Sequence, residues 1–186
     1  MVFSFEVWHA PSMKPASETF VVFRLGAARL ALSRGEVLEI LPLPRLLSPA
    51  GAPSVLAGYM NVGGEALAII RLGRLLDPQA PLEEAGIYSH IIRLAPAGRR
   101  MGLLVDRVED AAAEAQALEP VEPSDSLNGA LAANIRLEGQ LCGLLSSERL
   151  LNAHEAAKLQ EMTEMMQERL RLWDGLDQER PPGAPD

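Results

Sequence analysis

Few side chains in this sequence could act as nucleophiles, proton carriers or metal ligands, and those few are scattered along the chain. The histidines His9, His90 and His154 do not form a pair with the spacing of a metal site such as H-E-x-x-H. The single cysteine, Cys142, lies within the apolar run 141–145, which indicates a buried, inert thiol. One cysteine cannot form an internal disulfide, so the chain suits a reducing compartment such as the cytoplasm.

One group of carboxylates, Asp106 with Glu109 and Asp110, could in principle carry out acid–base chemistry. Solvent-facing strand and turn residues explain this group better than a catalytic site does. Neither a G-x-x-x-x-G-K-[ST] phosphate loop nor a strand-to-helix G-x-G-x-x-G is present. Ser146-Ser147 before Glu148 resembles a helix start and not a nucleophile elbow. We therefore expect no catalytic residue, no metal and no cofactor.

Composition excludes several further classes of function. The net charge is −8 and aromatic residues make up only 4%, so neither a basic stripe nor a base-stacking platform for nucleic acid is expected. Hydrophobic residues make up 48% and the mean hydropathy is +0.06, which is typical of a globular chain. No apolar run reaches roughly 18 residues, so we expect no membrane insertion. The start of the chain lacks the pattern of a secretory signal.

Short apolar runs separated by turn residues dominate the chain from residue 20 to residue 145. The pair Gly63-Gly64 between two of these runs predicts a tight hairpin, because glycine adopts positive φ readily. The prolines from Pro42 to Pro53 predict a stiff connection outside any sheet interior. This spacing favours an all-β barrel or sandwich. The predicted strands are 20–25, 29–32, 37–41, 56–62, 66–72, 88–95, 101–108, 131–137 and 141–145.

The two ends of the chain differ from the middle. Residues 1–19 show no sustained period, which indicates a flexible leader. Asn152 followed by Glu155 predicts a helix start, and the helix should end near Gly175, before a disordered tail over 176–186. An apolar stripe runs along the predicted helix over 152–175. In one interpretation, the first turns of this helix pack on the β region and complete the core. In the other, its distal half, 165–173, binds another protein or a second copy of the chain. The stripe consists of Leu159, Met162, Met166, Leu170 and Trp173.

Four motifs in order resemble the CheW family, the adaptors of bacterial chemotaxis-type pathways. They are F-V-V-F-R-L-G at 20–26, V-L-E-I at 37–40, P-S-V-L-A-G-Y-M-N-V-G-G at 53–64 and G-L-L-V-D-R-V at 102–108. The closing strand and short helix of the family resemble residues 139–151. The resemblance covers residues 20–151 and implies two SH3-like five-stranded β-barrel subdomains packed together, followed by a C-terminal α-helix.

The resemblance also implies a function without catalysis, as a scaffold that couples receptors to a kinase. Its expected partners are the regulatory domain of a CheA-type histidine kinase and the cytoplasmic tip of chemoreceptors, which would enter a groove between the barrels. Because strand side chains alternate, some of the implied contact residues are equally well explained as core. The implied kinase- or receptor-facing residues are Val37, Glu39, Ile40 and Leu41, and the implied groove residues are Gly58, Asn61 and Val62.

This sequence departs from the family pattern at two places. Gly63 stands where the family usually has Arg, and residues 68–72 replace its Pro-x-x-Asp-Leu run. The usual Arg faces the Glu at position 39, and Arg71 is a candidate substitute. Three hypotheses follow: a receptor–kinase adaptor, a divergent CheW-like module of an accessory pathway with altered partners, or an uncharacterised enzyme on a β scaffold. Self-association through the C-terminal helix is a further alternative.

Overall fold

The computed structural model describes residues 18–81, 85–95, 100–121, 127 and 129–178, with side chains as far as residue 172. Of the expected leader, only Glu18 and Thr19 fall within the described residues, and Thr19 already begins a strand. The expected tail lies outside them from residue 179 onward.

The first of two β-sheets has six strands in the order β8-β1-β2-β11-β10-β9. It joins the hairpin at the start of the described chain to strands that come after residue 106. β2 and β11 run parallel, whereas the other neighbouring strands are antiparallel. The strands are β1 (Thr19–Leu25), β2 (Ala28–Ser33), β8 (Arg107–Glu114), β9 (Ala117–Glu119), β10 (Leu131–Leu137) and β11 (Gln140–Leu145).

The second sheet has five strands in the order β3-β6-β7-β5-β4, and it is built from the middle of the chain. β5 and β7 run parallel and the other neighbours are antiparallel. A short helix, α1 (Leu72–Leu76), follows β5, and 3₁₀ turns cover Arg34–Glu36 and Ser147–Arg149. The strands are β3 (Val37–Pro42), β4 (Leu56–Val62), β5 (Glu65–Arg71), β6 (His90–Leu94) and β7 (Met101–Val105).

The β4–β5 hairpin turns where the glycine pair predicted it. Gly63 has φ +61° and Gly64 has φ +88°, so both central residues are left-handed. Val62 pairs with Glu65 across the turn. The N–H of Gly64 donates a hydrogen bond of 2.7 Å to Oδ1 of Asn61, which holds the turn closed.

The expected β-rich fold with a C-terminal helix is confirmed, but the structure differs from the expectation in three details. One sheet has six strands where five were expected, and among the described strands no pairing closes either sheet. The run 101–108 is not one strand: it breaks at Asp106, where the chain leaves the second sheet and enters the first. The N–H of Asp106 donates to the carbonyl of Arg24, and its carboxylate accepts from the N–H of Gly26. These two bonds fix the crossing against the β1–β2 turn.

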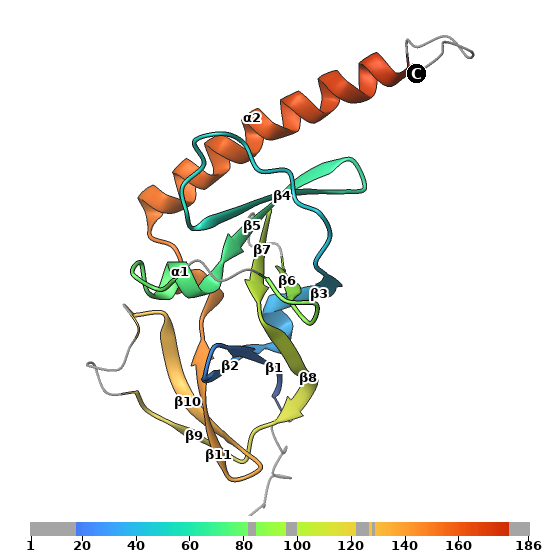
Figure 1. Ribbon diagram of the computed structural model, residues 1–186. Helices are drawn as coiled ribbons and strands as arrows, with labels where there is room; N and C mark the ends of the chain where they lie inside the picture. Colours follow the sequence, from blue (N-terminus) through green and yellow to red (C-terminus); the bar gives the residue numbers. More distant parts are fainter. Residues whose placement is uncertain (1–17, 82–84, 96–99, 122–126, 128, 179–186) are drawn as a thin grey trace, which may run out of the picture.

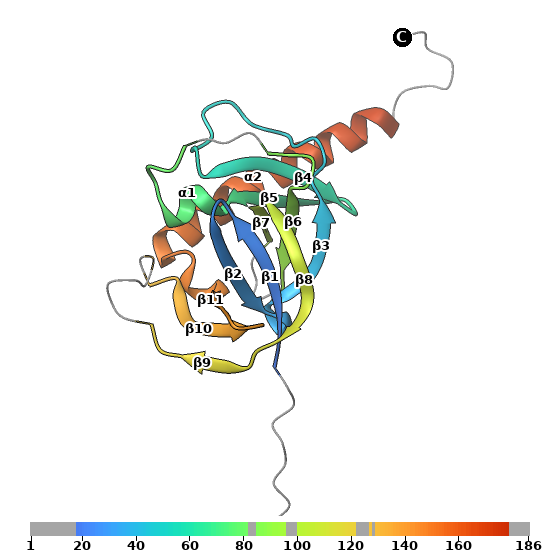
Figure 2. The same ribbon diagram turned by 60° about the horizontal axis from the view of Figure 1, so that its bottom comes forward.

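The main hydrophobic core lies between the two sheets and reaches the C-terminal helix, α2 (Ala153–Gln178). Phe23 comes from the first sheet, Ile92 from the second, and Met166 and Leu170 from α2. Figure 1 shows α2 crossing beside β4 and β5, and both Figure 1 and Figure 2 show its C-terminal turns extending beyond the sheets. The two sheets and the first part of the helix therefore share one core.

α2 begins with the predicted capping arrangement. The N–H of Glu155 donates to Oδ1 of Asn152, and the N–H of Asn152 donates to the carboxylate of Glu155, each at 2.9 Å. The helix continues to Gln178, past the predicted end at Gly175. One glycine inside a helix costs only about 1 kcal/mol and does not end it without a C-terminal capping partner.

Candidate protein-binding surface

The residues expected on β3 differ widely in exposure. Val37 is only 4% exposed and belongs to the main core, so its side chain supports β3 from inside. Ile40 is partly buried against the same core. Leu41 is partly buried against a smaller cluster under the second sheet. Glu39 has 38% of its side chain exposed.

Two of the residues expected on β4, Gly58 and Asn61, shape the backbone around this strand. Gly58 is buried, and a Cβ there would lie 2.8 Å from the carbonyl oxygen of Leu47. Leu47 and Tyr59 exchange two backbone hydrogen bonds of 2.8 Å, so the glycine lets the β3–β4 connection lie against β4. Asn61 is exposed, and its amide is engaged in the turn described above. Val62 is partly buried.

The expected contact residues do not form one continuous patch. β3 and β4 are the two edges of the second sheet, so Val37 and Glu39 are separated from Asn61 by three strands. Leu41 and Val62 are the exception, because both pack against the small cluster formed by Ala57, Leu67, Ile69 and Ile91. The sheet therefore curls enough for its two edge strands to share this cluster.

Two residues on β3 and β6 were missed by the sequence interpretation. Leu38 is 48% exposed, which makes it the most accessible large apolar residue of β3. Arg93 lies opposite Glu39, and its Nη1 donates to Glu39 Oε1 at 2.7 Å. The expected substitute, Arg71, instead donates to the carbonyls of Ser54 and Leu56 at 3.0 and 2.7 Å. The cation that faces Glu39 is therefore Arg93, and the suggestion of Arg71 was wrong.

A hollow of about 300 Å³ lies between the two sheets. The β1–β2 turn forms one wall and α1 forms another, and Asp106 lies at the crossing between the sheets. Gly58, Asn61 and Val62, which were expected to line a groove between the subdomains, do not line this hollow. The leucines that line it are Leu25, Leu30, Leu72, Leu76, Leu104 and Leu127.

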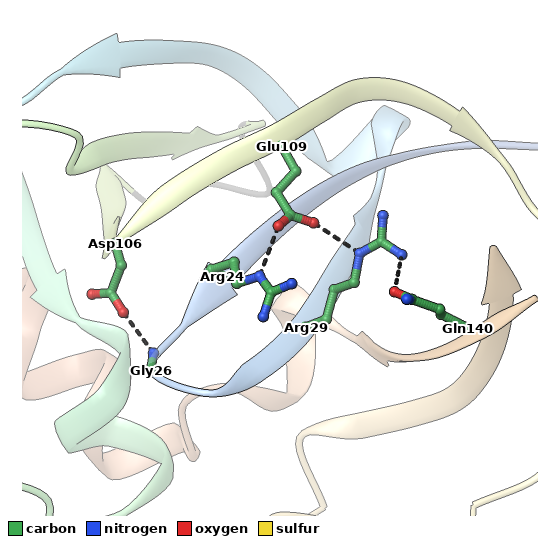
Figure 3. A network of polar contacts seen from close by, with 6 residues as sticks. All are labelled: Arg24, Gly26, Arg29, Asp106, Glu109 and Gln140. Carbon is green, nitrogen blue, oxygen red and sulfur yellow. Dashed lines mark hydrogen bonds and ion pairs between the residues drawn. The ribbon is translucent and has the colours of Figure 1, made fainter. Parts of the chain in front are cut away.

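Two of the carboxylates considered for catalysis, Asp106 and Glu109, have structural contacts, as Figure 3 shows. Glu109 accepts hydrogen bonds from Nε of Arg24 at 2.7 Å and from Nε of Arg29 at 2.8 Å. Nη1 of Arg29 also donates to Gln140 at 3.2 Å, which extends the network to the β10–β11 turn. The hydrogen bond from Arg24 is the main reason that the pKa of Glu109 lies below its ordinary value. Glu109 therefore joins β8 to the β1–β2 hairpin as an anion.

The remaining chemically active side chains do not converge. Cys142 is buried, and burial raises the pKa of its thiol to about 11, so it is a poor nucleophile. His154 is exposed in the first turn of α2, His90 lies on β6, and His9 lies outside the described residues. Among the described residues, no three potential ligands could hold a metal ion. In the part of the chain that the structure describes, no helix has an apolar stretch long enough to cross a bilayer.

Two β-sheets, a shared core and a C-terminal helix define a β-rich domain in which Asp106 and Glu109 serve the structure. The chain belongs to the CheW-like domain family, whose model matches residues 19–155. The scaffolding protein TtCheW from Thermoanaerobacter tengcongensis has the same fold, with a TM-score of 0.66 and 18% sequence identity over 79% of this chain and 96% of that one. A search of curated proteins found no match.

Proposed function

We propose that this chain is a cytoplasmic adaptor that couples chemoreceptors to a CheA-type histidine kinase in a chemotaxis-type signalling array. The observation that supports this function is the extent of the family match, which spans both sheets from residue 19 to residue 155. In this proposal the two sheets are the counterparts of the two SH3-like subdomains of the family, and the chain catalyses no reaction.

The accessible part of β3 is the proposed kinase contact. Leu38 offers an exposed apolar side chain. The neighbouring Glu39–Arg93 ion pair offers charged groups that can orient the kinase on this surface. Apolar residues at the centre of an interface commonly carry about 1–3 kcal/mol each. The hollow between the sheets is the proposed receptor contact, because its accessible leucines, Leu25, Leu104 and Leu127, can pack against the apolar face of a helix.

Reconstitution tests this function. A CheA-type kinase and a chemoreceptor from the same organism would be mixed with this chain, and kinase autophosphorylation and co-sedimentation of the kinase with receptor-containing membranes would be measured. We expect both to require this chain, and we expect Leu38→Asp to weaken kinase recruitment while the protein stays folded. Recruitment of the kinase at the same level without this chain would contradict the proposal.

A divergent adaptor of an accessory pathway is a second candidate, and one observation favours it. Gly63 replaces the usual Arg, and Glu39 is paired instead with Arg93 from the neighbouring strand. Glu39 still has a cationic partner, but this partner lies on β6 and not in the β4–β5 turn. This hypothesis predicts stronger binding to receptors of its own gene cluster than to receptors of flagellar pathways, measured by titration against both.

A further inference from the structure

A groove runs along one side of α2, between the helix and the β3–β4 connection. Its first hollow, of about 370 Å³, lies between the first turns of α2, α1 and residues 53–56. Its second hollow, of about 180 Å³, lies farther along α2 against residues 49–52. Met162 lines both hollows. From His154 to Arg169 the groove follows about 22 Å of helix, the length of four helical turns.

The floor of this groove is apolar and rich in methionine. Met165 is 59% exposed, so apolar surface is accessible at the distal end. Methionine side chains are unbranched and adaptable, and they are common on surfaces that receive amphipathic helices. The apolar residues along the groove include Val55, Leu56, Ile70, Leu75, Leu151, Leu159, Met162, Met165 and Met166.

The rim of the groove is basic, although the chain carries a net charge of −8. Arg74, Lys158 and Arg169 line it against one lining carboxylate, Glu155, which accepts from the N–H of Asn152 at the helix start. Lys158 also pairs with Glu161 at 3.0 Å, so the three cations outnumber the two neighbouring carboxylates by one. Arg74 donates through Nη1 to the carbonyl of Ala80 and through Nη2 to Oγ of Ser54, while its Nε is buried without a hydrogen-bond partner within the described part of the chain. This local excess of positive charge favours an acidic partner.

Segments of this chain do not have the matching chemistry. Residues 1–17 contain one acid and one lysine, and residues 179–186 contain no large apolar residue. The α2 helix of a second copy has already buried Met166 and Leu170 in its own core. We therefore propose that the groove binds an amphipathic helix with acidic flanks that belongs to another protein.

This partner would be additional to the kinase and the receptor. The family match ends at residue 155, so almost all of the α2 side of the groove lies beyond it. The hollow between the sheets shares only Arg74 with the first hollow of the groove. Occupation of the groove thus leaves both proposed adaptor contacts accessible.

A pair of designed peptides tests the proposal. Both have 16 residues and the same helical stripe of leucines, and one carries Glu and the other Lys at the flanking positions. Fluorescence anisotropy with the full chain should give a dissociation constant of tens of micromolar for the Glu peptide and about tenfold weaker binding for the Lys peptide. Equal affinities for the two peptides, or no binding of the Glu peptide, would overturn the proposal.

Charge reversal locates the binding site and provides a matched control. The double variant Lys158→Glu with Arg169→Glu should bind the Glu peptide about tenfold more weakly and should now prefer the Lys peptide. Arg171→Glu changes charge at an exposed position on the same helix, away from the groove, and should change the affinity by less than about twofold. Equal losses from Arg169→Glu and Arg171→Glu would show a general charge effect and refute the groove.

Methionine methyl NMR supplies a direct readout of position. On addition of the Glu peptide, the methyl signals of Met162, Met165 and Met166 should shift, and that of Met101, buried between the sheets, should not. Shifts confined to other methionines would place the peptide elsewhere. If the chain instead dimerises and the Glu peptide dissociates the dimer, a second copy is the occupant and the proposal is wrong.

Discussion

Glu39 and Arg93 lie opposite each other on β3 and β6, with Oε1 of Glu39 and Nη1 of Arg93 2.7 Å apart. The family resemblance implies a cation for this glutamate on the β4–β5 turn, where this chain has Gly63. Here the cation comes from the neighbouring strand of the same sheet, and the turn contains the two glycines Gly63 and Gly64. The pair therefore links two adjacent strands and does not tie the edge strand to a distant turn.

Arg93→Ala should lower the free energy of unfolding by about 0.5–1 kcal/mol, because an opposite-charge cross-strand pair contributes this much. Arg100→Ala is the matched control: its pair with Glu65 is longer, at 3.6 Å, and both side chains are about half exposed, so its loss should cost less than about 0.5 kcal/mol. Urea unfolding of both variants measures the difference. Equal losses would show that the Glu39 pair has no special role in stability.

Substitutions at two nearby residues of β3 should separate binding from folding. Leu38→Asp places a carboxylate at an exposed position and should weaken kinase binding about tenfold or more with almost no change in melting temperature. Ile40→Asp places a carboxylate against the core and should destabilise the fold by several kcal/mol. Thermal melting and kinase titration measure the two effects. A large loss of melting temperature in Leu38→Asp would refute β3 as the docking surface.

Local patterns in the sequence located most elements but could not supply their long-range pairing. Apolar runs and the glycine pair predicted the strands, because these signals act within a few residues. The crossing at Asp106 was not foreseen, because the motif 101–108 was taken as one strand although the exposed Asp106-Arg107 interrupts its apolar run. The Glu39–Arg93 pair depends on strand register, which one sequence does not reveal. Val37 was expected on a contact surface because its motif resembles the family, and the fold places it inside.

Gly63→Arg, the residue usual in the family, should not restore the usual charge pair. Glu39 is already engaged by Arg93, and Gly63 has φ +61°, where a side chain costs on the order of 1 kcal/mol. We expect a loss of about 1 kcal/mol in unfolding free energy, with receptor selectivity changed more than stability. Gly86→Arg is the control, because Gly86 has open space around it and no positive φ. A gain of stability in Gly63→Arg would contradict this account.

The Glu109 network should make stability depend on pH. The pKa of folded Glu109 lies below its ordinary value of 4.5, because Arg24 and Arg29 favour the carboxylate. The stability that ionised Glu109 contributes is therefore complete above the ordinary pKa, and it is lost as the pH falls through the pKa of the folded state. Glu109→Gln should be less stable than wild type at pH 7, and the difference should shrink between about pH 5 and pH 3. Glu148→Gln, away from the network, should keep the wild-type pH profile; a constant gap for Glu109→Gln would exclude the mechanism.

The distal half of α2 should contribute to stability, because it reaches back to the β4–β5 hairpin. Gln167 is buried; its Oε1 accepts from the N–H of Ala66 at 2.7 Å, and its Nε2 donates to the carbonyl of Gly64 at 2.8 Å. Gln167→Leu leaves these two backbone groups without partners and should cost about 1–3 kcal/mol. Gln160→Leu changes an exposed position of the same helix and should cost less than about 0.5 kcal/mol.

Truncation after Glu161 tests the same part of the helix more strongly. It removes Met166 and Leu170 from the core together with Gln167, so the free energy of unfolding should fall by on the order of 5 kcal/mol or more. Truncation after Leu172 keeps all three of these residues and should change the melting temperature little. Calorimetry of both truncated proteins measures the difference. If the chain cut after Glu161 melts like the full chain, the distal turns do not belong to the core, and the alternative in which 165–173 is reserved for a partner is correct.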